Sequence, residues 1–217
     1  MRILKYGVPQ SSVLGPELFK DYASPLASLI QSFGVSFHGY VDDTELYISF
    51  APGLDEVTAL DKIQQCIAAT KAWISRNYLK LNYDKTKFIV IGSPNNLRKV
   101  VAEHIIVGKH KIRVSAHVKN TCIGAIFDSS ATMEAQVMKT AQTAWYHLYS
   151  ISKIRAKLTA ERSRCTVHSY VTSRLDQNNS LLSGVPDAII SRLRKVQNAA
   201  AKLILGGKKQ DHVILLL

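Results

Sequence analysis

The chain has 217 residues, of which 47% are apolar and 20% are charged. These proportions are ordinary for a folded protein, and the length suffices for one sizeable domain or for a compact domain with a helical appendage. No stretch approaches the roughly 20 apolar residues that a spanning helix requires, and Gly7, Pro9 and Gln10 interrupt any apolar signal region. Three cysteines without Cys-x-x-Cys spacing are typical of reduced thiols. We therefore expect an intracellular protein, in the nucleus or the cytoplasm.

The formal net charge of +12 is unevenly distributed. Residues 1–108 carry +1, whereas residues 109–217 carry +11. Such a basic half indicates a polyanionic partner, because each Lys or Arg that binds a phosphate releases condensed counterions. Nucleic acid is the first candidate. An anionic membrane surface is the second, but the lack of a spanning segment leads us to expect no membrane partner.

The first half of the chain predicts helices and strands in alternation. Pro16 suits the first turn of a helix, because its missing N–H costs nothing there, and the apolar spacing continues to Gly34 with a bend expected at Pro25. Apolar and polar residues then alternate on both sides of a polar tip, which predicts a β-hairpin over 35–50. A second helix and four further strands are predicted at 54–77, 86–91, 104–107, 111–114 and 122–128.

From Met133 onward the apolar spacing becomes helical, and we predict three helices, at 133–151, 159–173 and 187–205. The polar stretch at 128–132 separates this helical half from the mixed one. The sequence therefore predicts an α+β fold with one region at 1–128 and a basic helical region at 129–217. The last helix carries an apolar seam with spacings of three and four residues, formed by Ile189, Leu193, Val196, Ala200 and Leu203.

Two adjacent carboxylates, Asp42 and Asp43, stand at the tip of the predicted hairpin. A bare Tyr-Val-Asp-Asp is usually a solvated turn, because aspartate is itself a good turn residue. Two further segments change this interpretation: GVPQSSVLGP lies upstream at 7–16, and LKLNYDKT lies downstream at 79–86. In this order the three segments resemble motifs B, C and D of the reverse transcriptases of LINE-type, non-LTR retrotransposons.

The resemblance continues beyond these motifs. The segment VKNTCIGAIFD at 118–128 is similar to a Val-Arg-Asn-Leu-Gly-Val-Ile-Phe-Asp segment of that family, and 166–204 is similar to the family's helical region after the palm. It implies a partial polymerase palm, an antiparallel sheet with packed helices, over 1–128, and a thumb-like region at 129–217. It also implies an RNA-directed DNA polymerase that uses two metal ions, with an RNA template and a DNA primer as partners.

The resemblance gives each motif an expected role. Asp42 would bind the catalytic Mg²⁺ or Mn²⁺ directly, and Asp43 would be the more peripheral acid, because successive residues of an extended strand point to opposite sides. Lys85 would protonate or electrostatically assist the leaving pyrophosphate. The pocket for the nucleotide and the template base would use Gly7, Pro9, Gln10 and Tyr40. Cations of the helical region would contact the nucleic-acid backbone, namely Lys139, Lys153, Arg155, Lys157, Arg162 and Arg164.

The chain departs from the family pattern in two places. The family's first metal-binding aspartate, in motif A, precedes motif B, where this sequence has only Met1 to Tyr6 and no acid. Ser11 replaces the second glycine of motif B. We therefore expect a truncated, catalytically incomplete polymerase that binds metal only if the missing palm strand is supplied. Two alternatives stay open: a non-catalytic nucleic-acid-binding remnant, and a helical protein-interaction module that uses the seam at 189–203.

Overall fold

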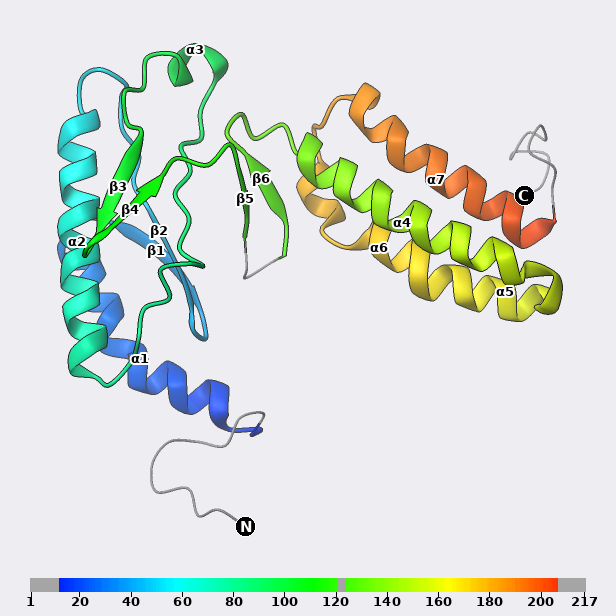
Figure 1. Cartoon of the computed structure of the whole chain (residues 1–217), viewed down its shortest axis with the longest axis horizontal. Helices are drawn as coiled ribbons and strands as arrows, with labels where there is room; N and C mark the ends of the chain where they lie inside the picture. The colour runs from blue at the N-terminus through cyan, green and yellow to red at the C-terminus, as the bar shows by residue number, and fades with distance from the viewer. Residues whose placement is uncertain (1–11, 121–123, 207–217) are drawn as a thin grey trace. The chain divides into compact units, whose positions relative to one another are not determined.

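The computed structural model describes residues 12–120 and 124–206. Contacts along the chain separate two compact units, Met1–Ala116 and His117–Leu217. The first unit mixes helices with two hairpins, and the second begins with a hairpin and continues as helices (Figure 1). The predicted α+β class is confirmed at this level.

The first unit begins with a helix whose first turn contains Pro16 and whose interior contains Pro25, as the sequence predicts. A two-residue loop joins the strands of the hairpin that follows it. The elements of this unit are α1 (Gly15–Ser32), β1 (Ser36–Tyr40), β2 (Asp43–Tyr47), α2 (Glu56–Arg76), α3 (Pro94–Leu97), β3 (His104–Val107) and β4 (His110–Arg113).

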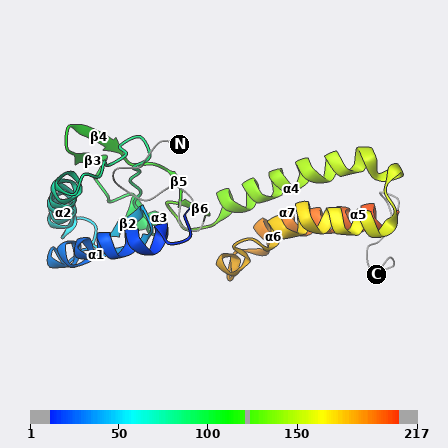
Figure 2. The same ribbon diagram turned by 90° about the horizontal axis from the view of Figure 1, so that it is seen from below.

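A small apolar core holds the first hairpin against the two long helices. Ile30 of α1, Val35 before β1 and Cys66 of α2 are almost completely buried together, and Phe37 and Leu46 of the hairpin pack against them. The helices α1 and α2 lie side by side in both views (Figure 1, Figure 2). Burial raises the pKa of the Cys66 thiol, so this residue behaves as a small apolar side chain at neutral pH.

Polar side chains of α2 attach the second hairpin to the same helix. The Oε1 atom of buried Glu56 accepts hydrogen bonds from the backbone N–H groups of Val101, at 2.9 Å, and Ala102, at 2.6 Å. The Oε1 atom of Gln64 accepts one from the N–H of Ile106, at 3.0 Å. Because charge-assisted hydrogen bonds are the stronger ones, Glu56 is the main attachment of the segment before β3.

The prediction of a strand at 86–91 is wrong, and without this strand the hairpins are not joined into one larger sheet. Residues 12–120 and 124–206 form three separate two-stranded antiparallel sheets, β1–β2, β3–β4 and β5–β6. In the predicted segment only Phe88 forms a bridge, to Val114, and its carbonyl accepts from the N–H of Ser115 at 2.8 Å. A strand needs a neighbour along its length to satisfy its backbone groups, and this segment has one at Phe88 only.

The second unit contains the three long helical segments that the sequence predicts, and a short hairpin precedes them. The middle segment runs from Ala160 to Asp176 and is interrupted by one π-helical turn. The elements are β5 (His117–Lys119), β6 (Ile126–Asp128), α4 (Glu134–Ile154), a 3-10 turn (Arg155–Lys157), α5 (Ala160–Val167), the π-helical turn (His168–Thr172), α6 (Ser173–Asp176), a second 3-10 turn (Asn179–Leu182) and α7 (Asp187–Leu205).

The helices of the second unit share one core. The seam of α7 is confirmed, since Leu193, Val196 and Ala200 are buried and Ile189 and Leu203 pack beside them. Their partners in α4 and in the α5–α6 segment are Val137, Ala141, Ala144, Leu148, Ile151, Val167, Val171 and Leu175. Because the seam is covered by helices of the same chain, the interaction-module alternative loses the surface on which it depended.

The hairpin β5–β6 belongs to the second unit, so the division by contacts falls before it rather than in the stretch 128–132. The Oε1 atom of buried Gln136 in α4 accepts a hydrogen bond from the N–H of Ile126 at 2.9 Å, which ties β6 to the helix. The polar stretch is a compact turn whose centre is the buried carboxylate of Asp128.

Candidate functional site

The two candidate metal ligands lie at the tip of the β1–β2 hairpin. Tyr40 and Asp43 are the last pair of the ladder, and Val41 and Asp42 form the loop between them. Tyr40 is 63% exposed, Asp42 is exposed and Asp43 is half-buried. Val41 has a φ of +55°, which is an outlier for a β-branched residue. Such strain clusters at functional sites, and here it belongs to the loop that presents the acids.

At this tip the two aspartates are not both in extended backbone, contrary to the expectation from the sequence. Opposite orientations for Asp42 and Asp43 follow only if both residues are in extended backbone. Asp43 is the first residue of β2, but Asp42 is in the loop. The loop rather than the strand period therefore sets the relation between the two carboxylates. Both aspartates come from one hairpin, so a metal ion bound by them would receive protein ligands from this hairpin only.

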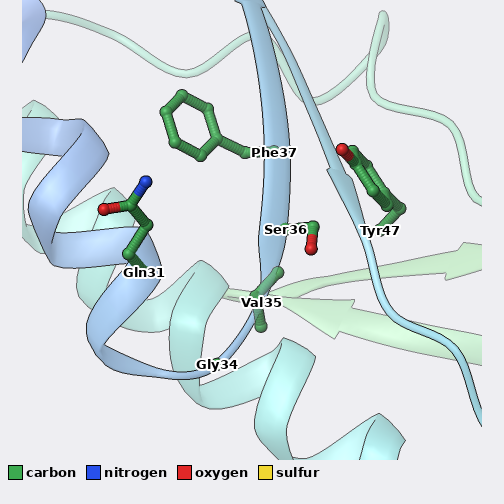
Figure 3. Close-up of a pocket in the computed structure, with 6 residues that line it drawn as sticks. All are labelled: Gln31, Gly34, Val35, Ser36, Phe37 and Tyr47. Atoms are coloured by element: carbon green, nitrogen blue, oxygen red, sulfur yellow. The ribbon is translucent and has the colours of Figure 1, made fainter.

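A shallow hollow lies at the opposite end of the same hairpin (Figure 3). Ser36 pairs with Tyr47 there, at the end of the ladder remote from Asp43. In Figure 3 the ring of Phe37 points toward the helix that carries Gln31, whereas Tyr47 stands on the neighbouring strand. The lining residues carry no charged side chain, so this hollow offers a phosphate or a metal ion no counter-charge.

Lys85 lies in a separate turn that follows α2. Its backbone N–H donates to Oδ1 of Asn82 at 3.2 Å, and its side chain is exposed. Tyr83 of this turn stacks on His110 of β4, with ring centroids 4.2 Å apart, and Lys71 holds its Nζ 5.8 Å from the Tyr83 ring. Within the described part of the chain, Lys85 forms no ion pair with either aspartate of the hairpin tip.

The remaining residues assigned to the nucleotide pocket, Gly7, Pro9 and Gln10, lie outside the described residues. Among the residues that are described, no group of three or more His, Cys, Asp or Glu side chains has a metal-binding arrangement. The chemistry of the donor set still suits Mg²⁺, since carboxylate oxygens are its preferred protein ligands. Asp42 and Asp43 thus fit one side of such a site.

The cations of the second unit that were predicted to contact the nucleic-acid backbone lie on several surfaces. Lys139 and Lys153 are exposed on α4, and Lys157 is exposed after it. Arg162 and Arg164 are exposed on α5, on either side of buried Ser163. Two residues apart on a helix are about 200° apart around its axis, so these arginines flank the core side from opposite directions. They do not form one patch with each other.

The role predicted for Arg155 must be corrected, because its side chain forms hydrogen bonds within the fold. Its Nε donates to the carbonyl of Leu203 at 2.8 Å, and its Nη2 donates to that of Ile204 at 2.9 Å. Its Nη1 donates to the carbonyl of Leu158 at 3.1 Å. A cation that satisfies the last carbonyls of a helix also complements its dipole. Arg155 therefore caps α7 rather than facing solvent as a phosphate contact.

The sequence reasoning overlooked a set of exposed aromatic residues in the second unit. Trp145, Tyr146 and Tyr149 of α4 and Tyr170 of the π-helical turn are between 44% and 68% exposed. The sequence could have revealed the three aromatic residues of α4, because a helical projection places the core residues on one side and Trp145, Tyr146 and Tyr149 away from it.

Comparison with protein-family models, with curated proteins and with solved structures finds no match to this chain. In the described residues no helix has both the length and the apolar character to cross a bilayer. What is established is therefore an α+β protein of two units, and the polymerase resemblance rests on its motifs.

Proposed function

We propose that the chain is the palm and thumb part of an RNA-directed DNA polymerase of the LINE type. The observation that supports this proposal is the hairpin tip. Asp42 is exposed in the two-residue loop whose Val41 has a φ of +55°, and half-buried Asp43 begins the strand after it, an arrangement that suits an acidic motif C. The order of motif B, motif C and motif D in the sequence supports it independently.

In this proposal Asp42 and Asp43 hold one side of a Mg²⁺ or Mn²⁺ site. Two such ions, when bound, stabilise the attacking and leaving oxygens of an in-line phosphoryl transfer. The protein's own contribution is to hold two hard oxygen donors at a fixed, solvent-accessible position. Tyr40, 63% exposed beside them, offers a ring against which a primer terminus can stack. Lys85 supplies a cation for the pyrophosphate.

The first prediction concerns the 217-residue polypeptide tested by itself. We expect no template-directed primer extension on an RNA template with Mg²⁺ or Mn²⁺, because carboxylates from a single hairpin leave the metal ions without half of their protein ligands. Incorporation of labelled nucleotide is the measurement.

The control for this assay is Asp42→Asn, with Asp61→Asn as a matched change at an exposed acid of α2. Extension by the unmodified chain that disappears in Asp42→Asn and persists in Asp61→Asn would overturn the expectation and make the chain a complete polymerase. Extension by the polypeptide joined to an upstream palm strand, with the same dependence on Asp42, is the result that supports the family proposal.

A second candidate function is nucleic-acid binding by the basic second unit without catalysis. The observation that favours it is charge: the second unit, residues 117–217, has 14 Lys and Arg against 6 Asp and Glu and so carries +8. In the described part of this unit the ion pairs are Arg192–Glu134 and Arg194–Asp187, so most of the cations keep their charge unneutralised. Of the six cations predicted to contact the nucleic-acid backbone, five remain available once Arg155 is assigned to the cap of α7. They are exposed Lys139, Lys153, Lys157, Arg162 and Arg164.

The second prediction is that charge reversal at Lys157, Arg162 and Arg164 weakens binding to any nucleic acid by about tenfold at moderate salt. The slope of log affinity against log salt should also fall, by roughly 0.7–0.9 for each phosphate contact removed. The loss should be equal for different sequences, because phosphate contacts carry no sequence information. Fluorescence anisotropy of labelled oligonucleotides at several salt concentrations measures both quantities.

The matched control reverses three exposed lysines of the first unit, Lys20, Lys62 and Lys99, and so changes the net charge equally. We expect a much smaller loss from it. Equal losses from both triple variants would mean that only net charge matters, and salt-insensitive binding would contradict the proposal for the second unit.

A further inference from the structure

The outer side of α4 carries aromatic rings where a helix of a small bundle normally carries charge. The core side of this helix is formed by Val137, Ala141, Ala144, Leu148 and Ile151. Away from that side are the residues of what we call the aromatic face: Trp145 (44% exposed), Tyr146 (68%) and Tyr149 (63%). Exposed rings gathered on one surface usually mark a binding site.

One ring of this face, that of Tyr146, is linked to two further rings. Tyr146 meets His147 edge to face, with centroids 5.4 Å apart, and His147 meets Tyr170 at 5.7 Å. Tyr170 belongs to the π-helical turn His168–Thr172, a type of distortion that is rare and is frequent at functional sites. Tyr170, 54% exposed, therefore lies in an interruption of the α-helical path and next to His147 of α4.

Cations accompany these rings, and acids do not. Lys153 holds its Nζ 4.4 Å from the centroid of the Tyr149 ring. Lys139, Tyr146 and Lys153 are spaced by seven residues and therefore follow one line along the helix. From Ala135 to Ala160 the sequence contains no Asp or Glu. The charge on this surface is thus complementary to an anion, and the rings call for a partner with flat apolar faces.

We propose that the aromatic face binds single-stranded nucleic acid by stacking bases on its tyrosines while its lysines contact phosphates. The inference rests on the proposed nucleic-acid binding of the second unit and is independent of the polymerase proposal. Unpaired bases expose their faces to stacking, whereas duplex bases are stacked on each other, so the rings favour single strands. A membrane surface suits the face less well, because polar Gln142 and Ser150 lie among the rings where an interfacial helix has aliphatic residues.

The test uses the full chain with Trp73→Phe, which leaves Trp145, part of the aromatic face, as the only tryptophan. Oligodeoxythymidylate is expected to quench the fluorescence of Trp145, and a DNA duplex is expected to bind more weakly. Tyr146→Ala and Tyr149→Ala should each weaken oligodeoxythymidylate binding by at least about fivefold, the lower end of the range for stacking, and should leave duplex binding nearly unchanged.

Two further variants separate stacking from other effects. Tyr146→Phe keeps the ring and should bind like the parent chain. Tyr78→Ala removes a 97% exposed tyrosine of the first unit and should also have no effect. Far-UV circular dichroism establishes that the variants stay folded, which we expect because the replaced rings are largely exposed.

Each other outcome overturns the inference. If Tyr146→Ala and Tyr149→Ala leave oligonucleotide binding unchanged, the stacking inference is contradicted. The proposal that the basic second unit binds phosphates is then unaffected. Equal losses for single strands and duplex contradict the preference for single strands. Quenching by phosphatidylserine vesicles without quenching by oligodeoxythymidylate assigns the face to a membrane surface. No binding of any nucleic acid contradicts both this inference and the proposal on which it rests.

Discussion

Replacing Arg155 with alanine is expected to lower the free energy of unfolding of the second unit by about 3 kcal/mol, because hydrogen bonds from charged donors each contribute on the order of 1.5–3 kcal/mol and partly buried carbonyls lose their partners. Three such bonds are lost, to Leu158, Leu203 and Ile204. Urea unfolding followed by the fluorescence of Trp145 in the Trp73→Phe background measures the change.

The matched control is Lys157→Ala, which removes an exposed cation two residues away and is expected to change the free energy by less than about 0.5 kcal/mol. Arg155→Lys should give an intermediate loss, since lysine keeps the charge but not the planar fork that reaches several carbonyls. If Arg155→Ala left stability unchanged and weakened nucleic-acid binding instead, Arg155 would be the phosphate contact that the sequence predicted.

Replacing Asp128 with asparagine is expected to destabilise the second unit by about 2 kcal/mol at neutral pH. Oδ1 of this buried carboxylate accepts from the N–H of Ser130, at 3.1 Å, and of Thr132, at 2.9 Å. Oδ2 accepts from the hydroxyl of Thr132 at 3.0 Å. An amide replaces one acceptor atom with a donor and removes the charge, so part of this set is lost. The same urea titration measures the change.

This effect should depend on pH, with a direction that follows from the pKa. Burial by itself raises the pKa of Asp128, but the hydrogen bonds from Thr132, Ser130 and Met133 outweigh it and hold the pKa below its ordinary value of 3.8. A depressed pKa means that the carboxylate stabilises the fold above that ordinary value and loses this contribution as the pH falls through the lower, folded value.

The difference between the parent chain and Asp128→Asn should therefore be full at pH 7 and shrink below about pH 4. Asp187→Asn is a suitable control, because its carboxylate is 93% exposed and its ion pair with Arg194 is long, at 3.7 Å. A difference for Asp128→Asn that stays constant from pH 7 to pH 3 would contradict the role of the carboxylate charge.

The sequence by itself determined the elements whose signal is local. The helix after Pro16, the hairpin with Asp42 and Asp43 at its tip and the apolar seam of α7 all follow from periodicity and turn chemistry over a few residues. The position of the candidate acids could therefore be predicted, as could the basic character of the second unit.

What only the tertiary structure decided is which groups find partners far along the chain. The segment 86–91 has the composition of a strand but no strand beside it, and the seam of α7 is covered by helices of its own chain. Nothing in the sequence distinguishes Arg155 from the other cations, yet its guanidinium donates hydrogen bonds to the carbonyls of Leu203 and Ile204. Local pattern sets the conformation of a segment, whereas the neighbour that satisfies its polar groups or covers its apolar side is set by chain folding over long distances, and no short stretch of sequence encodes it.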